Sequence, residues 1–193
     1  TTDSRHGLPT FPNRTKELIP TRPNQLWVSD ITYIPIWVDD ITYIFCYLSL
    51  ILDAYTEEII GWSVGPTLEM TYPVEALRMA LKRIEGMTNI NLIHHSDRGC
   101  QYASSEYVRL LQEHDIRISM TEDSNPTDNG MAERVNGIIK NEFLEPLQTP
   151  KNLLEALPLV DHAVRTYNTL RPHLSLNMRT PAQVYEGNNN FIG

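Results

Sequence analysis

Cysteine is scarce in this chain of 193 residues, and long apolar runs are missing. The two cysteines, Cys46 and Cys100, lie in unlike contexts, which favours reduced thiols in a cytosolic protein. Together with the six histidines they show no zinc-finger spacing. The longest apolar run, residues 44–52, is shorter than the roughly 20 residues that span a bilayer, and no secretory signal precedes it. We therefore expect a cytoplasmic protein without a membrane segment.

An excess of basic residues is also missing. The formal net charge is −8, whereas a stand-alone non-specific DNA-binding domain is usually basic. Residues 1–133 hold 10 Lys and Arg against 19 Asp and Glu, while residues 134–193 hold 6 against 5. The chain begins at Thr1 rather than Met. We therefore expect a piece of a longer protein, in which another segment could supply affinity for DNA.

The order of predicted elements is typical of an α/β domain. Residues 1–24 contain Pro9, Pro12, Pro20 and Pro23 and are expected to form an extended arm or linker. Beyond them, apolar periodicity predicts three antiparallel strands and then alternating helices and strands. The predicted strands are 25–37, 41–52, 58–64, 90–94 and 116–120, and the predicted helices are 72–84, 104–114, 129–144 and 151–170. This order predicts a mixed five-stranded sheet, an antiparallel meander plus parallel strands, flanked by helices.

Three carboxylates have contexts that favour a common site. Asp30 lies inside an aromatic and β-branched strand, Asp97 directly follows an apolar run, and Glu133 lies one turn into a predicted helix. Carboxylate oxygens are ligands that Mg²⁺ prefers, and a bound divalent metal activates water or a hydroxyl against a phosphodiester. Taken singly, each acid has an ordinary explanation on a strand surface, at a strand end or in a first helical turn. The combination with the flanking residues favours a metal-dependent site.

Four sequence blocks carry a resemblance to a known family. They are Trp27-Val-Ser-Asp-Ile-Thr-Tyr33, His94-His-Ser-Asp-Arg-Gly-Cys-Gln-Tyr102, Asp128-Asn-Gly-Met-Ala-Glu-Arg-Val-Asn-Gly137, and Tyr167-Asn-Thr-Leu-Arg-Pro-His-Leu-Ser-Leu176 with Thr180-Pro181. On these blocks the chain resembles the catalytic core of insertion-sequence transposases of the IS3 family, in the retroviral-integrase-like superfamily. The 35 residues between Asp97 and Glu133 match the DD35E spacing of that family.

The resemblance implies a fold, an activity and partners. The implied fold is RNase H-like. The implied activity is Mg²⁺-dependent cleavage at the 3′ ends of an element and transfer of the 3′-OH into target DNA, with two metal ions and with Mn²⁺ as a substitute. The implied partners are element-end DNA, target DNA, further copies assembled on DNA, and an N-terminal helix-turn-helix region that this chain lacks. A bacterial cytosolic location, nucleoid-associated during activity, follows from the same resemblance.

Residue roles follow from the same blocks. By resemblance, Asp30, Asp97 and Glu133 form the catalytic, metal-binding triad. Lys140 lies two turns beyond Glu133 and matches a basic position that contacts DNA. Arg134 stands where Ser is common in relatives, so it either adds a phosphate contact or points to solvent. The full set of expected DNA-binding residues is Lys140, Arg134, Gln101 and Arg98.

Several alternatives remain open from the sequence. His94 or His95 could assist proton transfer, although a structural role is favoured, and Asp53 is either a fourth ligand or a turn residue. The function is alternatively that of an RNase H-like nuclease that never joins strands, or of a non-catalytic domesticated DNA-binding or interaction module. The predicted division is an arm over 1–24, an RNase H-like integrase core over 25–147, and a C-terminal helix and tail over 148–193 packed on that core.

Overall fold

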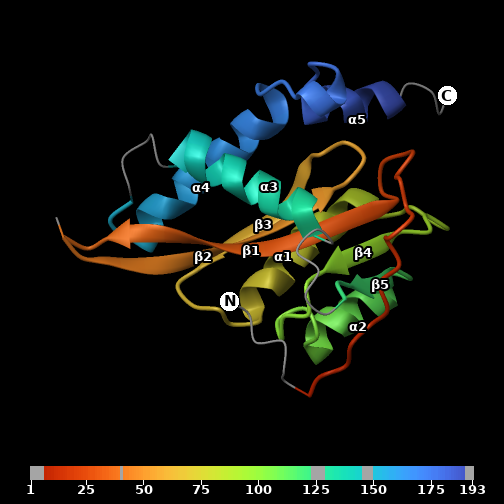
Figure 1. The fold of residues 1–193 in the computed structure, drawn as a ribbon, viewed down its shortest axis with the longest axis horizontal. Coiled ribbons are helices and arrows are strands. Elements are labelled where there is room, and N and C mark those ends of the chain that lie inside the picture. Colours follow the sequence, from red (N-terminus) through yellow and green to blue (C-terminus); the bar gives the residue numbers. More distant parts are fainter. Residues whose placement is uncertain (1–6, 40, 123–128, 145–149, 190–193) are drawn as a thin grey trace.

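The computed structural model describes residues 7–39, 41–122, 129–144 and 150–189, with a five-stranded sheet at the centre (Figure 1). Its strands are β1 (Leu26–Trp37), β2 (Tyr43–Asp53), β3 (Ile59–Gly65), β4 (Ile93–Ser96) and β5 (Arg117–Met120). They lie in the order β3-β2-β1-β4-β5, with β1, β2 and β3 antiparallel and with β4 and β5 parallel to β1. The predicted mixed sheet is confirmed.

The central strand β1 separates two apolar cores. Its side chains alternate between the faces of the sheet, so that Val28 enters one core and Trp27 the other. β2 pairs with β1 along its whole length, from Trp27 to Trp37. β4 pairs with β1 only over Leu26 to Val28. The remainder of β1 forms a long hairpin with β2 that extends beyond the other strands (Figure 1).

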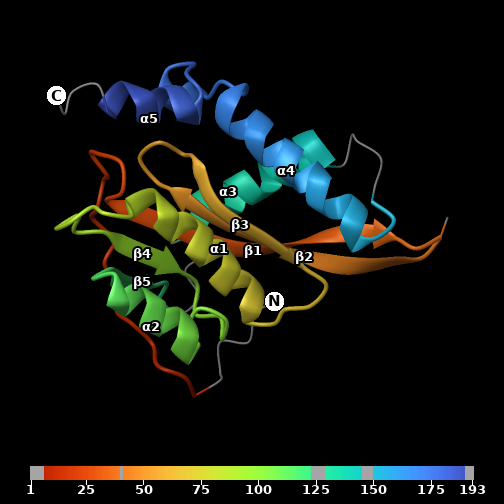
Figure 2. The same cartoon turned by 180° about the vertical axis from the view of Figure 1, so that it is seen from behind.

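Helices cover both faces of the sheet. One core contains α1 (Thr71–Leu81) and α2 (Ser105–Glu113), and Figure 2 shows α1 crossing the sheet with α2 beside β5. The other core contains α3 (Gly130–Ile138) and α4 (Leu153–Thr169), and α5 (Pro181–Asn189) follows α4. This layering explains the long apolar strands, because a sheet covered on both faces buries side chains of both parities.

The C-terminal helix α4 shares the core of β1 and α3. Val160, Val164 and Tyr167 are buried there against strand residues. At its start, the Asn152 side chain accepts a hydrogen bond from the Glu155 N–H and so caps the helix. The predicted boundary at 147/148 lies outside the described residues, and the division into a core and a C-terminal part stays a prediction.

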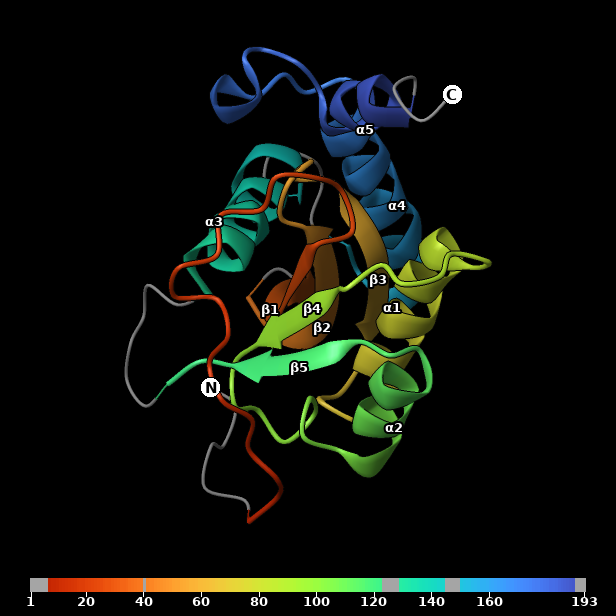
Figure 3. The same ribbon diagram turned by 90° about the vertical axis from the view of Figure 1, so that its right-hand side faces the viewer.

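The N-terminal arm contains neither helix nor strand over the described residues 7–24. It runs past α3 and across β5 (Figure 3). The Arg14 backbone N–H donates to Ser119 Oγ at 2.8 Å, and its Nε donates to the Ile118 carbonyl at 3.3 Å. The arm thereby covers part of the outer edge of the sheet, which would otherwise expose unpaired backbone groups. Within the described ranges, no helix has the length and apolar character needed to cross a membrane.

Three elements differ from their predicted form. The strand predicted at 90–94 is β4 at Ile93–Ser96, because its polar side chains are buried with partners rather than exposed. The helix predicted at 129–144 is α3 followed by a π-helical segment, Ile139–Leu144, and that predicted at 72–84 is α1 followed by a 3₁₀ turn, Lys82–Ile84. The tail contains α5, which the sequence analysis did not predict; a further 3₁₀ turn, Leu174–Leu176, precedes it.

Candidate active site

Asp30 and Asp97 occupy equivalent places on neighbouring strands. The parallel register pairs Val28 of β1 with His95 of β4, and each acid lies two residues beyond that pair. Residues two apart on a strand share a face, and Val28 faces the core that contains α3. The two carboxylates therefore lie at adjoining points on the α3 side of the sheet, where β4 ends and β1 continues.

Asp30 lies in an environment that disfavours the charged form of its carboxyl. Burial raises the pKa of its carboxyl to about 6, and the nearby Asp97 and Glu133 carboxylates add to that rise. A hydrogen bond from Asn136 Nδ2, at 2.8 Å from Asp30 Oδ2, acts in the opposite direction because it stabilises the charged form. Asp97 and Glu133 thus both lie within electrostatic range of Asp30.

Two asparagines fix the helix that carries Glu133. Asn129, just before α3, donates through Nδ2 to the Ser29 carbonyl at 2.9 Å, and Asn136 donates to Asp30. The two acceptors are adjacent residues of β1, and the two asparagines lie before and after Glu133 in the sequence. Ala132 and Val135 are buried against the sheet, whereas Glu133 is exposed. Neither asparagine was predicted as a site residue from the sequence, although the spacing of Asn136, one turn after Glu133, was an available signal.

The chemistry of the donor set fits a divalent metal, although the acids do not form one coordination shell here. Three carboxylates offer the hard oxygen ligands that Mg²⁺ takes in proteins. Burial, and to a lesser extent the neighbouring carboxylates of Asp97 and Glu133, raise the pKa of Asp30, and a bound cation would favour its charged form. Over the residues that the structure describes, however, no group of three His, Cys, Asp or Glu side chains is placed to hold an ion. The expected Mg²⁺ site thus rests on chemistry and electrostatic proximity.

The two histidines before Asp97 are part of the sheet interior. His94 Nε2 lies 2.6 Å from Ser29 Oγ and 2.8 Å from the Tyr107 hydroxyl, and burial lowers the pKa of His94 to about 3. His95 Nδ1 lies 2.8 Å from Ser119 Oγ. Both side chains are fully buried. This arrangement favours the structural role over proton transfer, because His94 stays neutral at physiological pH.

Asp53, the possible fourth ligand, closes the turn after β2. It is fully buried, and its carboxylate accepts hydrogen bonds from the backbone N–H groups of Asn24 and Thr56. A third backbone donor is Tyr55 at 3.0 Å. These contacts agree with the turn interpretation.

The four expected DNA-binding residues point in different directions. The Lys140 ammonium lies 4.5 Å from the centre of the Tyr33 ring, three residues along β1 from Asp30. Arg134 pairs with Glu57 at 3.2 Å. Gln101 is buried and donates to the Leu68 carbonyl at 3.0 Å, while Arg98 Nε donates to the Thr121 carbonyl at 2.7 Å. DNA contacts by these residues stay predictions, and for Gln101 such a contact requires an existing bond to break.

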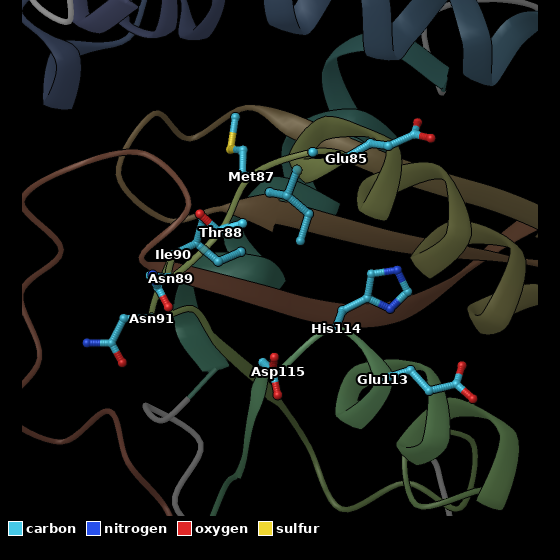
Figure 4. A pocket seen from close by; sticks show the side chains of 11 residues that line it. Glu85, Met87, Thr88, Asn89, Ile90, Asn91, Glu113, His114 and Asp115 are labelled. Carbon is cyan, nitrogen blue, oxygen red and sulfur yellow. The ribbon is translucent and has the colours of Figure 1, made fainter.

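A hollow in the described part of the chain lies away from the acids. It has a volume of about 850 Å³ and is lined by residues 84–91 and 113–115, among them Glu85, Glu113 and Asp115 (Figure 4). These segments precede β4 and β5, whereas Asp97 follows β4. The hollow is therefore at the opposite end of these strands from the three acids. A smaller cavity of about 200 Å³, lined by Val28, His95 and Asn129 among others, lies closer to them.

Comparison with known sequences places the chain in a family. A model described as integrase core domain matches residues 20–126, and a second model with the same description matches residues 114–181. The first match alone covers more than half of the chain. The chain therefore belongs to the integrase core domain family.

Relatives among insertion-sequence proteins confirm the resemblance to IS3-family transposases. The insertion element IS600 uncharacterized 31 kDa protein of Shigella sonnei is 35% identical over 188 residues, which cover 96% of this chain and 66% of that protein. Transposase InsF for insertion sequence IS3A of Escherichia coli (strain K12) is 30% identical over 179 residues, which cover 92% of this chain and 60% of the transposase. This chain thus spans two thirds or less of the length of these relatives.

Solved structures confirm the fold. The catalytic core domain of HTLV-2 integrase in complex with magnesium (dimeric form) aligns with a TM-score of 0.62 at 21% identity, covering 86% of this chain and 98% of that domain. A chain of the simian T-cell lymphotropic virus intasome in complex with PP2A regulatory subunit B56 gamma aligns at 0.68 and 22%, covering 95% of this chain and 60% of that chain. The predicted RNase H-like fold is thus confirmed.

Proposed function

We propose that this chain is the catalytic domain of a DNA transposase, in which Asp30, Asp97 and Glu133 are the catalytic, metal-binding residues. The observation that carries the proposal is the convergence of the first two acids on neighbouring strands beside the helix that bears the third. Membership of the integrase core domain family gives that convergence its chemical meaning. The chain would cleave at the 3′ ends of an element and join the freed 3′-OH to target DNA.

Each residue has a distinct part in this chemistry. Asp30, fixed on the central strand, and Asp97, just past the end of β4, would hold the metal from the sheet. Glu133 would complete the ligand set from the helix, and Asn136 orients the Asp30 carboxylate through its hydrogen bond. Two Mg²⁺ ions, or Mn²⁺ in their place, would supply activation of the attacking oxygen and stabilisation of the leaving oxygen. Lys140, on the π-helical continuation of α3, would neutralise a DNA phosphate.

The remaining partners are proposals of the same kind. Two element ends must be held together for joining, so further copies of the chain would assemble on DNA. The net charge of −8 leaves most DNA affinity to a helix-turn-helix region elsewhere in a longer protein. Arg98, Arg134 and Gln101 stay proposed DNA contacts, and a bacterial cytosolic, nucleoid-associated location follows from the activity. We also propose the division into an arm over 1–24, a core over 25–147 and a C-terminal helix and tail over 148–193.

A strand-joining assay with full-length protein tests the function. Wild-type protein should cut at the 3′ end of element DNA and yield joined products with Mg²⁺, whereas Glu133→Gln should lose both steps, by at least about 1,000-fold, because a neutral amide is a poor Mg²⁺ ligand. Unchanged thermal unfolding of the variant would show that the fold is intact. Cleavage without joined products in wild type would favour the nuclease alternative, and retained activity in Glu133→Gln would mean that Glu133 is misassigned.

A further inference from the structure

The helix that carries Glu133 is attached to the rest of the molecule by two ion pairs of opposite polarity. Arg134 of α3 pairs with Glu57 of the β2–β3 turn at 3.2 Å. Glu142, in the π-helical continuation of α3, accepts two bonds from Arg171, at 2.6 and 2.7 Å. The helix therefore contributes one cation and one anion, and the body of the protein contributes the complementary charges. We call these two pairs the α3 clamp.

Glu57 is the unusual member of the α3 clamp. It is only 6% exposed, and its backbone adopts a left-handed conformation with φ of 57°. Few residues other than glycine and asparagine adopt this conformation without strain. Its second carboxylate oxygen lies 3.4 Å from His173 Nδ1. A buried carboxylate in a strained turn, placed between an arginine and a histidine, indicates that its position is required.

Residues 167–176, which we call the C-terminal block, hold the turn that contains Glu57. The Tyr167 hydroxyl donates to the Glu57 carbonyl at 3.0 Å. The Asn168 side chain bonds to both backbone groups of Ile59, accepting from its N–H at 3.0 Å and donating to its carbonyl at 2.9 Å. The ring of His173 stacks edge-on against Tyr167, with 4.8 Å between the centroids. The block therefore binds the two residues on either side of Glu58 and fixes the turn.

We propose that Glu57 is a positioning residue for Glu133, acting through Arg134. The inference rests on the proposed function, because it presumes that Glu133 is a metal ligand. Successive side chains of a helix point about 100° apart, so Glu133 and its neighbour Arg134 lie on different flanks of α3. Asn129 and Asn136 attach the helix to β1, and Arg134 attaches another flank to Glu57. Together these attachments set the rotation of α3 about its axis and with it the direction of Glu133.

Charge-removing variants of the full-length protein test the proposal. Glu57→Gln keeps the side-chain volume and removes the charge that Arg134 meets; Arg134→Gln removes the same pair from a half-exposed position, so that folding is preserved. Glu113→Gln is the matched control, because it breaks the Arg109–Glu113 pair at 2.6 Å on the surface of α2. Three quantities are measured for each variant: the Mn²⁺ affinity, from the electron paramagnetic resonance of free Mn²⁺, the joining rate and the melting temperature.

We expect weaker Mn²⁺ binding and slower joining, with an unchanged melting temperature. Glu57→Gln and Arg134→Gln should each weaken Mn²⁺ binding and slow joining by about 10-fold or more, as removal of a residue that orients a metal ligand does. Higher Mg²⁺ should restore part of the rate, and Glu113→Gln should match wild type. Should Glu57→Gln fail to fold, Arg134→Gln alone decides.

Two outcomes would overturn the inference. One is wild-type Mn²⁺ affinity and joining in Arg134→Gln; the other is a lower melting temperature with unchanged Mn²⁺ affinity, which would assign the α3 clamp to stability alone. Failure of the proposed function looks different: Glu133→Gln, measured beside them, would then bind Mn²⁺ as wild type does, or wild-type protein would give no joined product.

Discussion

At the scale of single residues, the sequence predicts the three acids of the proposed site but not the residues that hold them in place. Asp30, Asp97 and Glu133 were recognisable because their local contexts and family blocks are short-range properties. Asn136 was not, because its value depends on which strand α3 covers, and a polar residue in a helix is otherwise unremarkable. Its bond to Asp30 shows that the carboxylate proposed as a metal ligand is oriented by a residue from another element.

The raised pKa of Asp30 predicts a pH-dependent stability. The pKa of its carboxyl is about 6 in the folded chain, against 3.8 for the ordinary group. The free energy of unfolding therefore falls as the pH rises from about 4 to 6, and the whole penalty is present above pH 6. Asp30→Asn removes this penalty and should stabilise the chain at pH 8, without divalent metal, by up to about 3 kcal/mol.

Urea denaturation of wild type and Asp30→Asn at pH 4 and pH 8 checks this expectation. The difference between them should shrink towards zero at pH 4, where the carboxyl is protonated in the folded chain. Equal stability of the two proteins at pH 8 would show that the Asp30 carboxylate is not held in an unfavourable, crowded environment.

At the scale of elements, strands and helices were predicted well wherever apolar periodicity decided them. β1 and α4 were placed within two residues at each end. β4 was misplaced because His94 and His95 are polar, and only the partners Ser29, Tyr107 and Ser119 explain their burial. The π-helical end of α3 was not predicted from periodicity; its Glu142 meets Arg171 of the fourth sequence block.

The close contact between β3 and α1 predicts that position 61 accepts only glycine without loss of stability. A Cβ at Gly61 would lie 2.2 Å from the Ala76 carbonyl oxygen and 3.1 Å from Ala80 Cβ. Gly61→Ala must therefore separate strand from helix, which should cost about 3 kcal/mol and lower the melting temperature by roughly 6–12 °C.

Gly187→Ala is the control for that variant. Gly187 lies within α5, and a Cβ there would meet no heavy atom within 4 Å. Because alanine favours helix over glycine, this variant should gain about 0.5–1 kcal/mol. Calorimetry of both variants decides: a Gly61→Ala protein as stable as wild type would contradict the close packing of β3 on α1.

At the scale of the whole molecule, the sheet joins distant parts of the sequence at one point. β4 inserts beside β1, which brings residues 30 and 97 together, and α3 crosses the same strand. The antiparallel meander could be predicted from short turns. The order β1-β4-β5 could not be derived from periodicity, and it was not predicted. Packing of a C-terminal helix on the core was predicted, but the face of the sheet that α4 shares with α3 became visible only in the structure.

The central claim is that Asp30, Asp97 and Glu133 form a divalent-metal site. Anomalous diffraction from a crystal of this chain soaked in Mn²⁺ tests it most directly. The account predicts a peak within about 2.5 Å of carboxylate oxygens of both Asp30 and Asp97, with Glu133 turned towards it. A peak confined to the distant hollow at Glu85, Glu113 and Asp115, or no peak at saturating Mn²⁺, would contradict it.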